Sequence, residues 1–316
     1  MLHNAHPLTE LKTCQEYLNR PTAPAHWWEA PDGHVLGGRD LLRNEQGTWL
    51  GLTKQGRIAV LTNFQEDNVQ LEARSRGEMV NAYLTQPANS LGSTQDFIES
   101  LVEGEGLKGV GGFSLVCGKI GEPLAVISNR TPSVEGITWI ANGKDETIGL
   151  SNAAFANRSW PKVIRGEELL ASAIKANIEA MAPQSSLIED LFHVLGDDTL
   201  PKKPKGMGWD SYVKELRKSV FIPVIGGQGE DDLGAEDLAA ATSNRHVTVD
   251  DSARTVDTGD GHSDVYGTQK QTVVLVDHQG MVTIVERTLY DENSKEIPTA
   301  ERDRRFEFFI ERWSEE

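Results

Sequence analysis

Two pairs of β-rich runs, each joined by a short turn, constrain the fold of this chain most strongly. Residues 47–63 form two such runs around a turn at 54–56, and residues 272–288 repeat the plan around 277–280. Runs rich in β-branched residues on either side of a short Gly-containing turn are typical of antiparallel hairpins. The sequence therefore predicts a hairpin in each of these segments.

The remaining elements are predicted from alternation and from helix start signals. Capping-box patterns begin at Ser75 and Ser186, another helix follows Thr94, and an apolar stripe from about Glu167 makes the 160–181 region helical. Further strands are predicted in residues 111–118, 122–129, 137–141 and 304–313. Strands come in pairs and helices in blocks, which argues against a parallel sheet. The pattern favours an α+β fold in which antiparallel sheets are covered by helices.

Composition excludes several classes of protein. The 316 residues carry a net charge of −17, which argues against nucleic acid or an anionic membrane surface as the main partner. No run reaches the 18 apolar residues of a membrane span, and the first residues lack the features of a secretory signal. The two cysteines, Cys14 and Cys117, exclude a secreted disulfide framework and favour a reducing compartment. We therefore expect a cytoplasmic protein.

Much of the acid excess lies in residues 226–264, which are rich in Gly, Ser, Thr and Asp. Such a composition has few large apolar side chains to bury and predicts a disordered insertion. Residues 228–263 are therefore expected to be mobile and dispensable for folding. The segment "DTGDGHSD" suggests a calcium loop, but Val256 stands where its first acidic ligand must be, so no calcium site is expected.

Five sequence blocks connect the chain to a known family. They are "LNRPTAPAHWW", "GGRDLLRNEQGTWLGLTKQGRIAVLTNF", "SRGEMV", "GLSNAAFANRSWPKV" and "YGTQKQTVVLVDHQGMVTIVERT". In order and spacing they resemble the transport and Golgi organisation protein 2 family, also called the NRDE family. The resemblance implies one domain over residues 1–316. It also implies the αββα sandwich of the N-terminal-nucleophile hydrolases, in which two mostly antiparallel sheets lie between helices.

The chemistry of those hydrolases requires a nucleophile at the mature N-terminus, whose own α-amine acts as the general base. The family pattern begins Met-Cys and reaches Asn-Arg-Asp-Glu shortly before "RPTAPAHWW". Here Leu2 occupies the second position, and residues 13–16 replace the motif so that only Glu16 is retained. Cys14 is internal and has no α-amine beside it. The sequence therefore predicts no catalytic residue and a chain that is not an enzyme as written.

Residues 1–12 are atypical for the family. They offer only Leu2, Leu8 and Leu11 as large apolar side chains, and Pro7 interrupts them. Uneven apolar spacing and a proline are poorly suited to a central strand. We therefore expect an empty or badly filled strand position. Either an upstream or alternative start supplies the strand, or the chain has abandoned the catalytic terminus.

Four residues are candidates for ligand binding. By resemblance to the cysteine-type hydrolases, Asn63 and Asn152 would lie at the rim of one cleft, although asparagine is also favoured in turns. Arg39 and Arg57 could bind a carboxylate or phosphate as bidentate forks, although solvated arginines would explain both. His26 lies beside two tryptophans without a second ligand at metal-site spacing, so no metal site is expected.

Three functional classes remain open. The first is a non-catalytic member that binds a small hydrophobic or amphiphilic ligand and supports Golgi organisation and protein secretion. For this class the resemblance implies haem or acyl-CoA as ligand and a cytoplasmic, Golgi-associated or mitochondrial location. The second is an N-terminal cysteine amidohydrolase whose nucleophile strand is missing from the sequence, and the third is a scaffold without a ligand.

Overall fold

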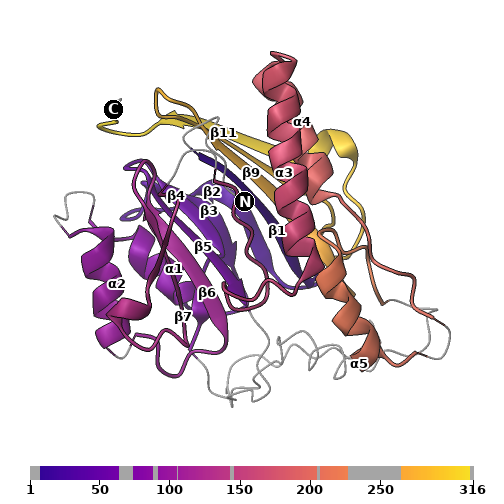
Figure 1. Cartoon of the computed structure of the whole chain (residues 1–316), viewed down its shortest axis with the longest axis horizontal. Helices are drawn as coiled ribbons and strands as arrows, with labels where there is room; N and C mark the ends of the chain where they lie inside the picture. Colours follow the sequence, from indigo (N-terminus) through magenta and orange to yellow (C-terminus); the bar gives the residue numbers. More distant parts are fainter. Residues whose placement is uncertain are drawn as a thin grey trace.

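A computed structural model describes residues 8–63, 74–87, 92–104, 106–142, 146–204, 207–226 and 265–313. These residues form four layers, in which two sheets lie face to face and helices cover both outer faces (Figure 1). All neighbouring strands within the two sheets run antiparallel. The predicted α+β sandwich of two antiparallel sheets is thus confirmed.

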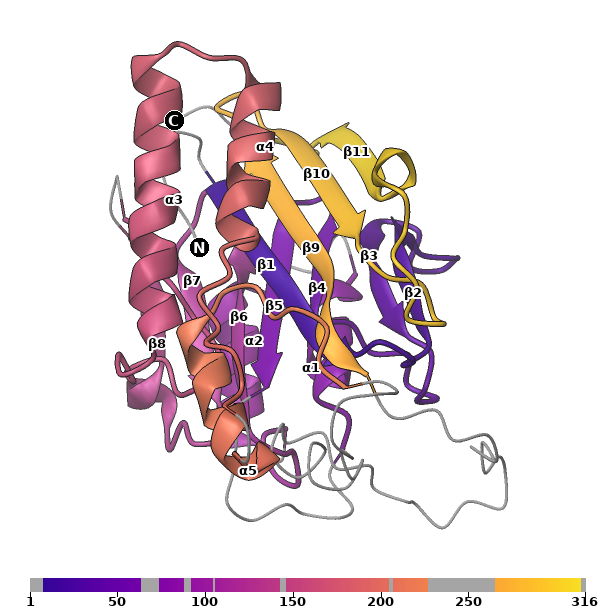
Figure 2. The ribbon, with the colours of Figure 1, turned by 90° about the vertical axis from the view of Figure 1, so that its right-hand side faces the viewer.

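The described part of the chain places four strands in the first sheet and seven in the second. The first sheet has the order β1 (Leu8–Tyr17), β9 (Tyr266–Val276), β10 (Met281–Thr288) and β11 (Asp303–Phe309). The second runs in chain order: β2 (Thr22–Trp27), β3 (Val35–Asp40), β4 (Leu50–Thr53), β5 (Arg57–Asn63), β6 (Phe113–Lys119), β7 (Leu124–Ser128) and β8 (Thr138–Ile140). Figure 2 shows β1, from the start of the chain, beside β9, from near its end.

Helices cover the outer face of each sheet. On the seven-stranded sheet lie α1 (Arg76–Leu84) and α2 (Thr94–Glu103), and on the four-stranded sheet lie α3 (Pro161–Glu179) and α4 (Gln184–Leu195). The short α5 (Trp209–Tyr212) continues into a 3₁₀ turn, Val213–Lys218. Two further 3₁₀ turns occupy Val134–Gly136 and Thr299–Glu301. In the described residues, no helix is both long enough and apolar enough to span a membrane.

Strand alternation divides the core into layers. On β1, Leu8 faces the other sheet and packs in the core between the sheets, whereas Leu11 faces α3 and α4. On β10, Ile284 and Val285 divide in the same way. Because successive side chains of a strand point to opposite faces, one short strand can supply two cores.

Both predicted hairpins are present. Residues 47–63 contain β4 and β5, and residues 272–288 contain the end of β9, a turn and β10. The two turns contain Gly56 and Gly280, whose φ values of 83° and 78° favour glycine over any other residue. The further predicted strands correspond to β6, β7, β8 and β11, and the 160–181 region holds α3.

The prediction that residues 8–12 are poorly suited to a strand is wrong, although the strand that they begin lies at the edge of the four-stranded sheet and not in its middle. These residues begin β1, which pairs with β9 from Leu8 opposite Val276 to Tyr17 opposite Tyr266. The uneven spacing of Leu8 and Leu11 was misleading because each residue belongs to a different face of the strand. Residues 1–7 lie outside the described part of the chain.

Two predicted capping boxes are also wrong. Ser75 precedes α1 without a side-chain capping bond, and Ser186 lies inside the first turn of α4, which starts after Pro183. A capping box does form at Ser93, whose hydroxyl accepts from the N–H of Asp96 before α2. The predictions of mobility for residues 228–263 and of no calcium site concern residues outside the described part of the chain.

Candidate functional site

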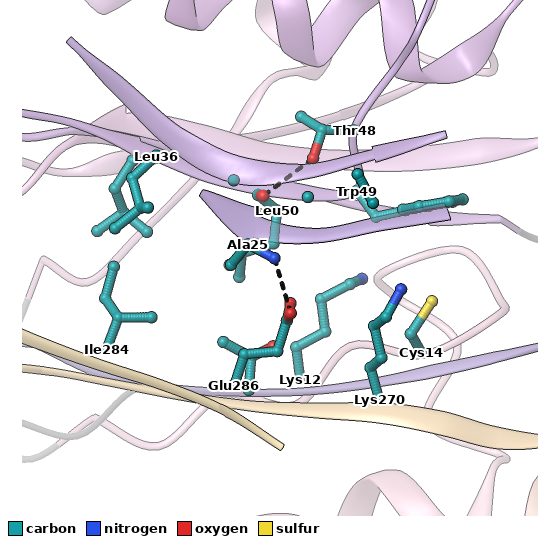
Figure 3. A pocket seen from close by; sticks show the side chains of 15 residues that line it. Lys12, Cys14, Ala25, Leu36, Thr48, Trp49, Leu50, Lys270, Ile284 and Glu286 are labelled. Atoms are coloured by element: carbon teal, nitrogen blue, oxygen red, sulfur yellow. Dashed lines mark hydrogen bonds between the residues drawn. The ribbon is translucent and has the colours of Figure 1, made fainter. Parts of the chain in front are cut away.

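A cavity of about 40 Å³ lies between the two sheets (Figure 3). A single water needs roughly 10–15 Å³ on the same measure, so the space suits a few waters or one small polar group. The lining comes from β1, β2, β3, β9, β10 and the segment around β4: Lys12, Cys14, Ala23, Ala25, Leu36, Gly37, Gly38, Thr48, Trp49, Leu50, Leu52, Lys270, Thr272, Ile284 and Glu286.

Small residues form the wall on the seven-stranded sheet. Ala23 and Ala25 from β2 face the cavity beside Gly37 and Gly38 from β3. A Cβ on Gly37 would lie 2.8 Å from the backbone oxygen of Leu50, so this position has no room for a side chain. The lack of side-chain volume on this wall leaves the space open.

Polar residues form much of the opposite wall. The pairing of β1, β9 and β10 aligns Lys12 with Thr272 and Thr272 with Glu286, while Cys14 lies opposite Lys270. Residues two apart on a strand share a face, so these side chains all point towards the other sheet.

The cavity is polar at one end and apolar at the other. Figure 3 shows Lys12, Lys270 and Cys14 together near Trp49, with Ile284 and Leu36 at the opposite end. The arrangement matches a ligand that has an anionic group at one end and an apolar group at the other.

The two lysines are held by neutral oxygens. Lys12 Nζ donates to the backbone oxygen of Leu61 at 2.7 Å, and Lys270 Nζ donates to Thr22 Oγ1. Lys270 is 8% exposed, and burial of the ammonium lowers the pKa of Lys12. Neither lysine belongs to an ion pair within 4 Å among the described residues. An ammonium has three N–H donors, and the described bonds use one on each lysine.

Two carboxyl groups accompany the lysines. Glu286 Oε1 accepts from the backbone N–H of Ala25 at 2.7 Å, and burial raises the pKa of this carboxyl against the opposing effect of Lys270. Glu16, only 3% exposed, lies at the polar end of β1, and burial raises its pKa as well. Glu16 Oε2 is buried and has no hydrogen-bond partner in the described residues.

Cys14 is a poor nucleophile in this setting. Burial raises the pKa of its thiol, the negative charge of Glu16 raises it further, and Sγ lies 3.5 Å from Glu16 Oε1 as a hydrogen-bond donor. Because the thiolate is the reactive species, a protonated thiol has little reactivity at neutral pH. The geometry supports binding better than covalent catalysis.

The structure brings two of the predicted site residues together. Asn152 Nδ2 donates to the backbone oxygen of Asn63 at 2.8 Å, and Thr62 Oγ1 beside it donates to the backbone oxygen of Ser151 at 3.1 Å. Asn63 Oδ1 is buried without a hydrogen-bond partner in the described part of the chain. Neither asparagine lines the cavity between the sheets. Their contact with a ligand stays a prediction.

The two predicted arginines form contacts within the protein. The guanidinium of Arg39 lies 3.4 Å from the ring centroid of Trp28 and donates to the backbone oxygen of Gln46. Arg57 donates to the backbone oxygens of residues 86 and 87, after the end of α1. Neither lines the cavity, and their role in ligand binding also stays a prediction.

His26 has a structural partner, since its Nδ1 lies 2.8 Å from the backbone oxygen of Pro24. A cluster of three or more His, Cys, Asp or Glu side chains with metal-binding geometry is not found among the described residues.

Sequence reasoning missed Lys12, Lys270 and Glu286. Glu10, Lys12 and Glu16 fall on alternate positions with Cys14, and these charges were the available signal in β1. Its usual interpretation is a solvated strand face, because charged residues are seldom buried. Only the packing of the second sheet on this face shows that the charges are internal.

Comparison with known proteins agrees with the sequence blocks. The model of the Transport and Golgi organisation 2 family matches residues 2–291. This chain belongs to that family. The bovine Transport and Golgi organization protein 2 homolog is 28% identical over 291 residues, covering 90% of this chain and 88% of the relative. The human homolog is 26% identical over 318 residues, covering 98% of this chain and 94% of the relative.

Among solved structures, a mutant of conjugated bile acid hydrolase from Clostridium perfringens covers 98% of this chain and 95% of its own. The two sequences are 10% identical and the TM-score is 0.35. The layer order described above stands on strand pairing and does not depend on this likeness.

Proposed function

We propose that this family member is a non-catalytic binding protein for a small amphiphile with an anionic group. The anion lies between Lys12 and Lys270, and the apolar part extends towards Leu36 and Ile284. The observation that carries the proposal is the pair of ammonium groups, without an ion pair in the described residues, at the polar end of a cavity whose other end is apolar.

The energetic reason is the cost of holding two ammonium groups partly or fully out of water without a carboxylate in direct contact. Moving an ammonium out of water costs several kcal/mol even after the protein relaxes, and an opposite charge with good hydrogen bonds offsets that cost. The ligand anion would accept charge-assisted hydrogen bonds from both lysines. The lack of a carboxylate within 4 Å of either lysine in the described residues therefore favours a closer anionic partner supplied by a ligand.

The volume of the cavity limits the ligand. About 40 Å³ accommodates a carboxylate and adjacent carbons, but not a whole haem or acyl-CoA without movement of the surrounding side chains. Haem carries propionates and acyl-CoA carries phosphates, so both ligands suggested by the family resemblance could present an anion to the lysines. Octanoate, haemin and an acyl-CoA are therefore the three probes of choice.

Titration calorimetry with these probes tests the proposal. We expect binding by the wild-type chain and at least tenfold weaker binding by Lys270→Met, since one of the two ammonium groups is lost. The matched control is Lys175→Met on the exposed side of α3, where the lysine lies near Glu179. Thermal melting confirms that each variant is folded. Failure of all three probes to bind, or unchanged affinity in the Lys270 variant, would refute the proposal.

The alternative of an active amidohydrolase is less well supported. Its chemistry needs an ionised or base-activated nucleophile, whereas burial and Glu16 keep the Cys14 thiol protonated. A covalent cysteine probe separates the two proposals, because rapid stoichiometric labelling of the native chain would favour the hydrolase.

The names of the bovine and human relatives concern transport and Golgi organization. We extend this role to the present chain, with Golgi organisation and protein secretion supported through the bound amphiphile. The chain would act in the cytoplasm, either free or associated with Golgi or mitochondrial membranes. Secretion in cells that carry only the Lys270→Met variant tests this role. Normal secretion with this weakly binding variant would show that secretion does not depend on the cavity.

A further inference from the structure

The carboxyl group of Glu286 shares the cavity with the two lysines, and this suggests how the ligand is taken up and released. We propose that binding of the anion at Lys12 and Lys270 is coupled to protonation of Glu286, so that the ligand is held at low pH and released as the pH rises. This inference rests on the proposed function, because it concerns the same cavity.

Glu286 is fixed in position by the backbone. Its Oε1 accepts the N–H of Ala25 from the opposite sheet, and Figure 3 shows the carboxyl directed across the cavity. This hydrogen bond can persist when the other oxygen carries a proton. Protonation therefore changes the charge of the group without requiring it to move.

Charged and titratable groups surround this carboxyl on every side. Lys12 on β1 and Lys270 on β9 line the same cavity, together with Cys14. Arg304 on β11 lies close, with Nη1 3.5 Å from the backbone oxygen of Ala25, and His26 lies on β2. Glu16 lies at the far end of the polar row and acts on the same lysine, Lys270.

The small volume makes repulsion between the ligand and Glu286 unavoidable. An anion in about 40 Å³ of space must lie close to a carboxylate that lines the same space. Two like charges a few ångströms apart disfavour one another, and one of them is relieved by taking up a proton. Burial already raises the pKa of Glu286, so a bound anion acts in the same direction.

Proton exchange at Lys12 changes the ligand affinity in the same direction as proton exchange at Glu286. A bound anion favours the charged form of Lys12, whose pKa burial lowers, so any proton exchanged there is also taken up. The complex therefore holds more protons than the free protein. Affinity must rise as the pH falls, by up to about tenfold per pH unit for one linked proton.

Calorimetry in two buffers of different ionisation enthalpy counts this proton directly. Octanesulfonate is the probe, because it stays ionised and cannot itself take up the proton. We expect net proton uptake by the wild-type chain and an affinity that falls as the pH rises, by up to about tenfold per pH unit. This measurement needs no variant.

The variant Glu286→Gln identifies the group. Its amide oxygen can still accept from Ala25, and it imitates the protonated acid. We expect its affinity at the high end of the pH range to be close to that of the wild type at the low end, with much less proton uptake. The control is Glu168→Gln on the exposed side of α3, which removes a carboxylate that does not line the cavity.

The outcomes separate the two proposals. If octanesulfonate and the other probes bind at no pH, the proposed binding function fails. If they bind with pH-independent affinity and without proton uptake, the binding function stands and the coupling is refuted. Proton uptake that is equal in the wild type and in Glu286→Gln also overturns the assignment to Glu286.

Discussion

Lys162 offers a sharp test of the electrostatic reasoning, on the opposite face of β1 from the cavity. It is the second residue of α3, is 8% exposed, and reaches Gln15 Oε1 at 3.4 Å. Its Nζ also lies 5.3 Å from the ring centroid of Trp160. Burial lowers the pKa of Lys162 from 10.5 to about 8. A helix N-terminus further disfavours a positive charge.

These values fix the size of the effect. At about 1.4 kcal/mol per pH unit, the difference between 10.5 and about 8 makes the charged lysine cost about 3 kcal/mol of stability at pH 7. The 3.4 Å hydrogen bond to Gln15 and the distant cation–π contact with Trp160 together offset about 1 kcal/mol of this cost. Methionine has a similar length and helix propensity. Lys162→Met should therefore stabilise the protein by about 2 kcal/mol at pH 7.

The direction in which stability changes with pH tests whether Lys162 is responsible. The folded state releases the proton of Lys162 near pH 8, whereas the unfolded chain holds it until about 10.5, so this group makes stability rise with pH between those values. Urea unfolding followed by tryptophan fluorescence at several pH values measures the slope. In Lys162→Met the free energy of unfolding should no longer show this rise with pH.

Lys175→Met on the exposed part of the same helix is the matched control and should change neither quantity. Equal stability of Lys162→Met and the wild type at pH 7, with an unchanged slope, would show that the ammonium is better solvated or paired than the structure indicates.

Three further expectations follow from packing and burial. Leu170→Ala, at a fully buried position of α3, should lower the free energy of unfolding in urea by about 2–5 kcal/mol. Ile178→Ala, at a position that is 55% exposed, should lower it by less than about 1 kcal/mol, and equal losses would contradict the layer assignment. Gly280→Ala should cost more than about 1 kcal/mol because its φ is 78°, whereas Gly92→Ala, with open space around its Cβ, should be nearly neutral. Cys14 should resist iodoacetamide at neutral pH until the chain unfolds, and fast native labelling would contradict its raised pKa.

The hairpins were predictable because their information is local. The segments that hold β4–β5 and β9–β10 carry β-branched runs and a glycine where the turn needs a positive φ. The helices α2 and α3 were likewise predictable from short-range periodicity. Their exact starts were less so, because capping depends on one or two hydrogen bonds that similar residues can form elsewhere.

The cavity was not predictable from the same kind of pattern. Lys12 belongs to β1 and Glu286 to β10, and only the strand order β1-β9-β10 brings them into one row. Alternate charged residues in β1 indicate one face of a strand but not whether that face is covered. The packing of the second sheet decides this, and its contribution includes alanines and glycines, whose significance is the side-chain volume they lack.

The charge of the whole chain and the charge of the cavity act in opposite directions on the proposed ligand. A net charge of −17 gives the surface a field that repels an anion approaching from solution. Salt screens exposed charges beyond about 8–10 Å but screens internal ones much less. Long-range steering therefore cannot supply the affinity, which must arise from contact with Lys12 and Lys270 inside the sandwich. A site of this kind selects by the fit of one anionic group at one end of an apolar space, and Glu286 sets the pH at which that group is accepted.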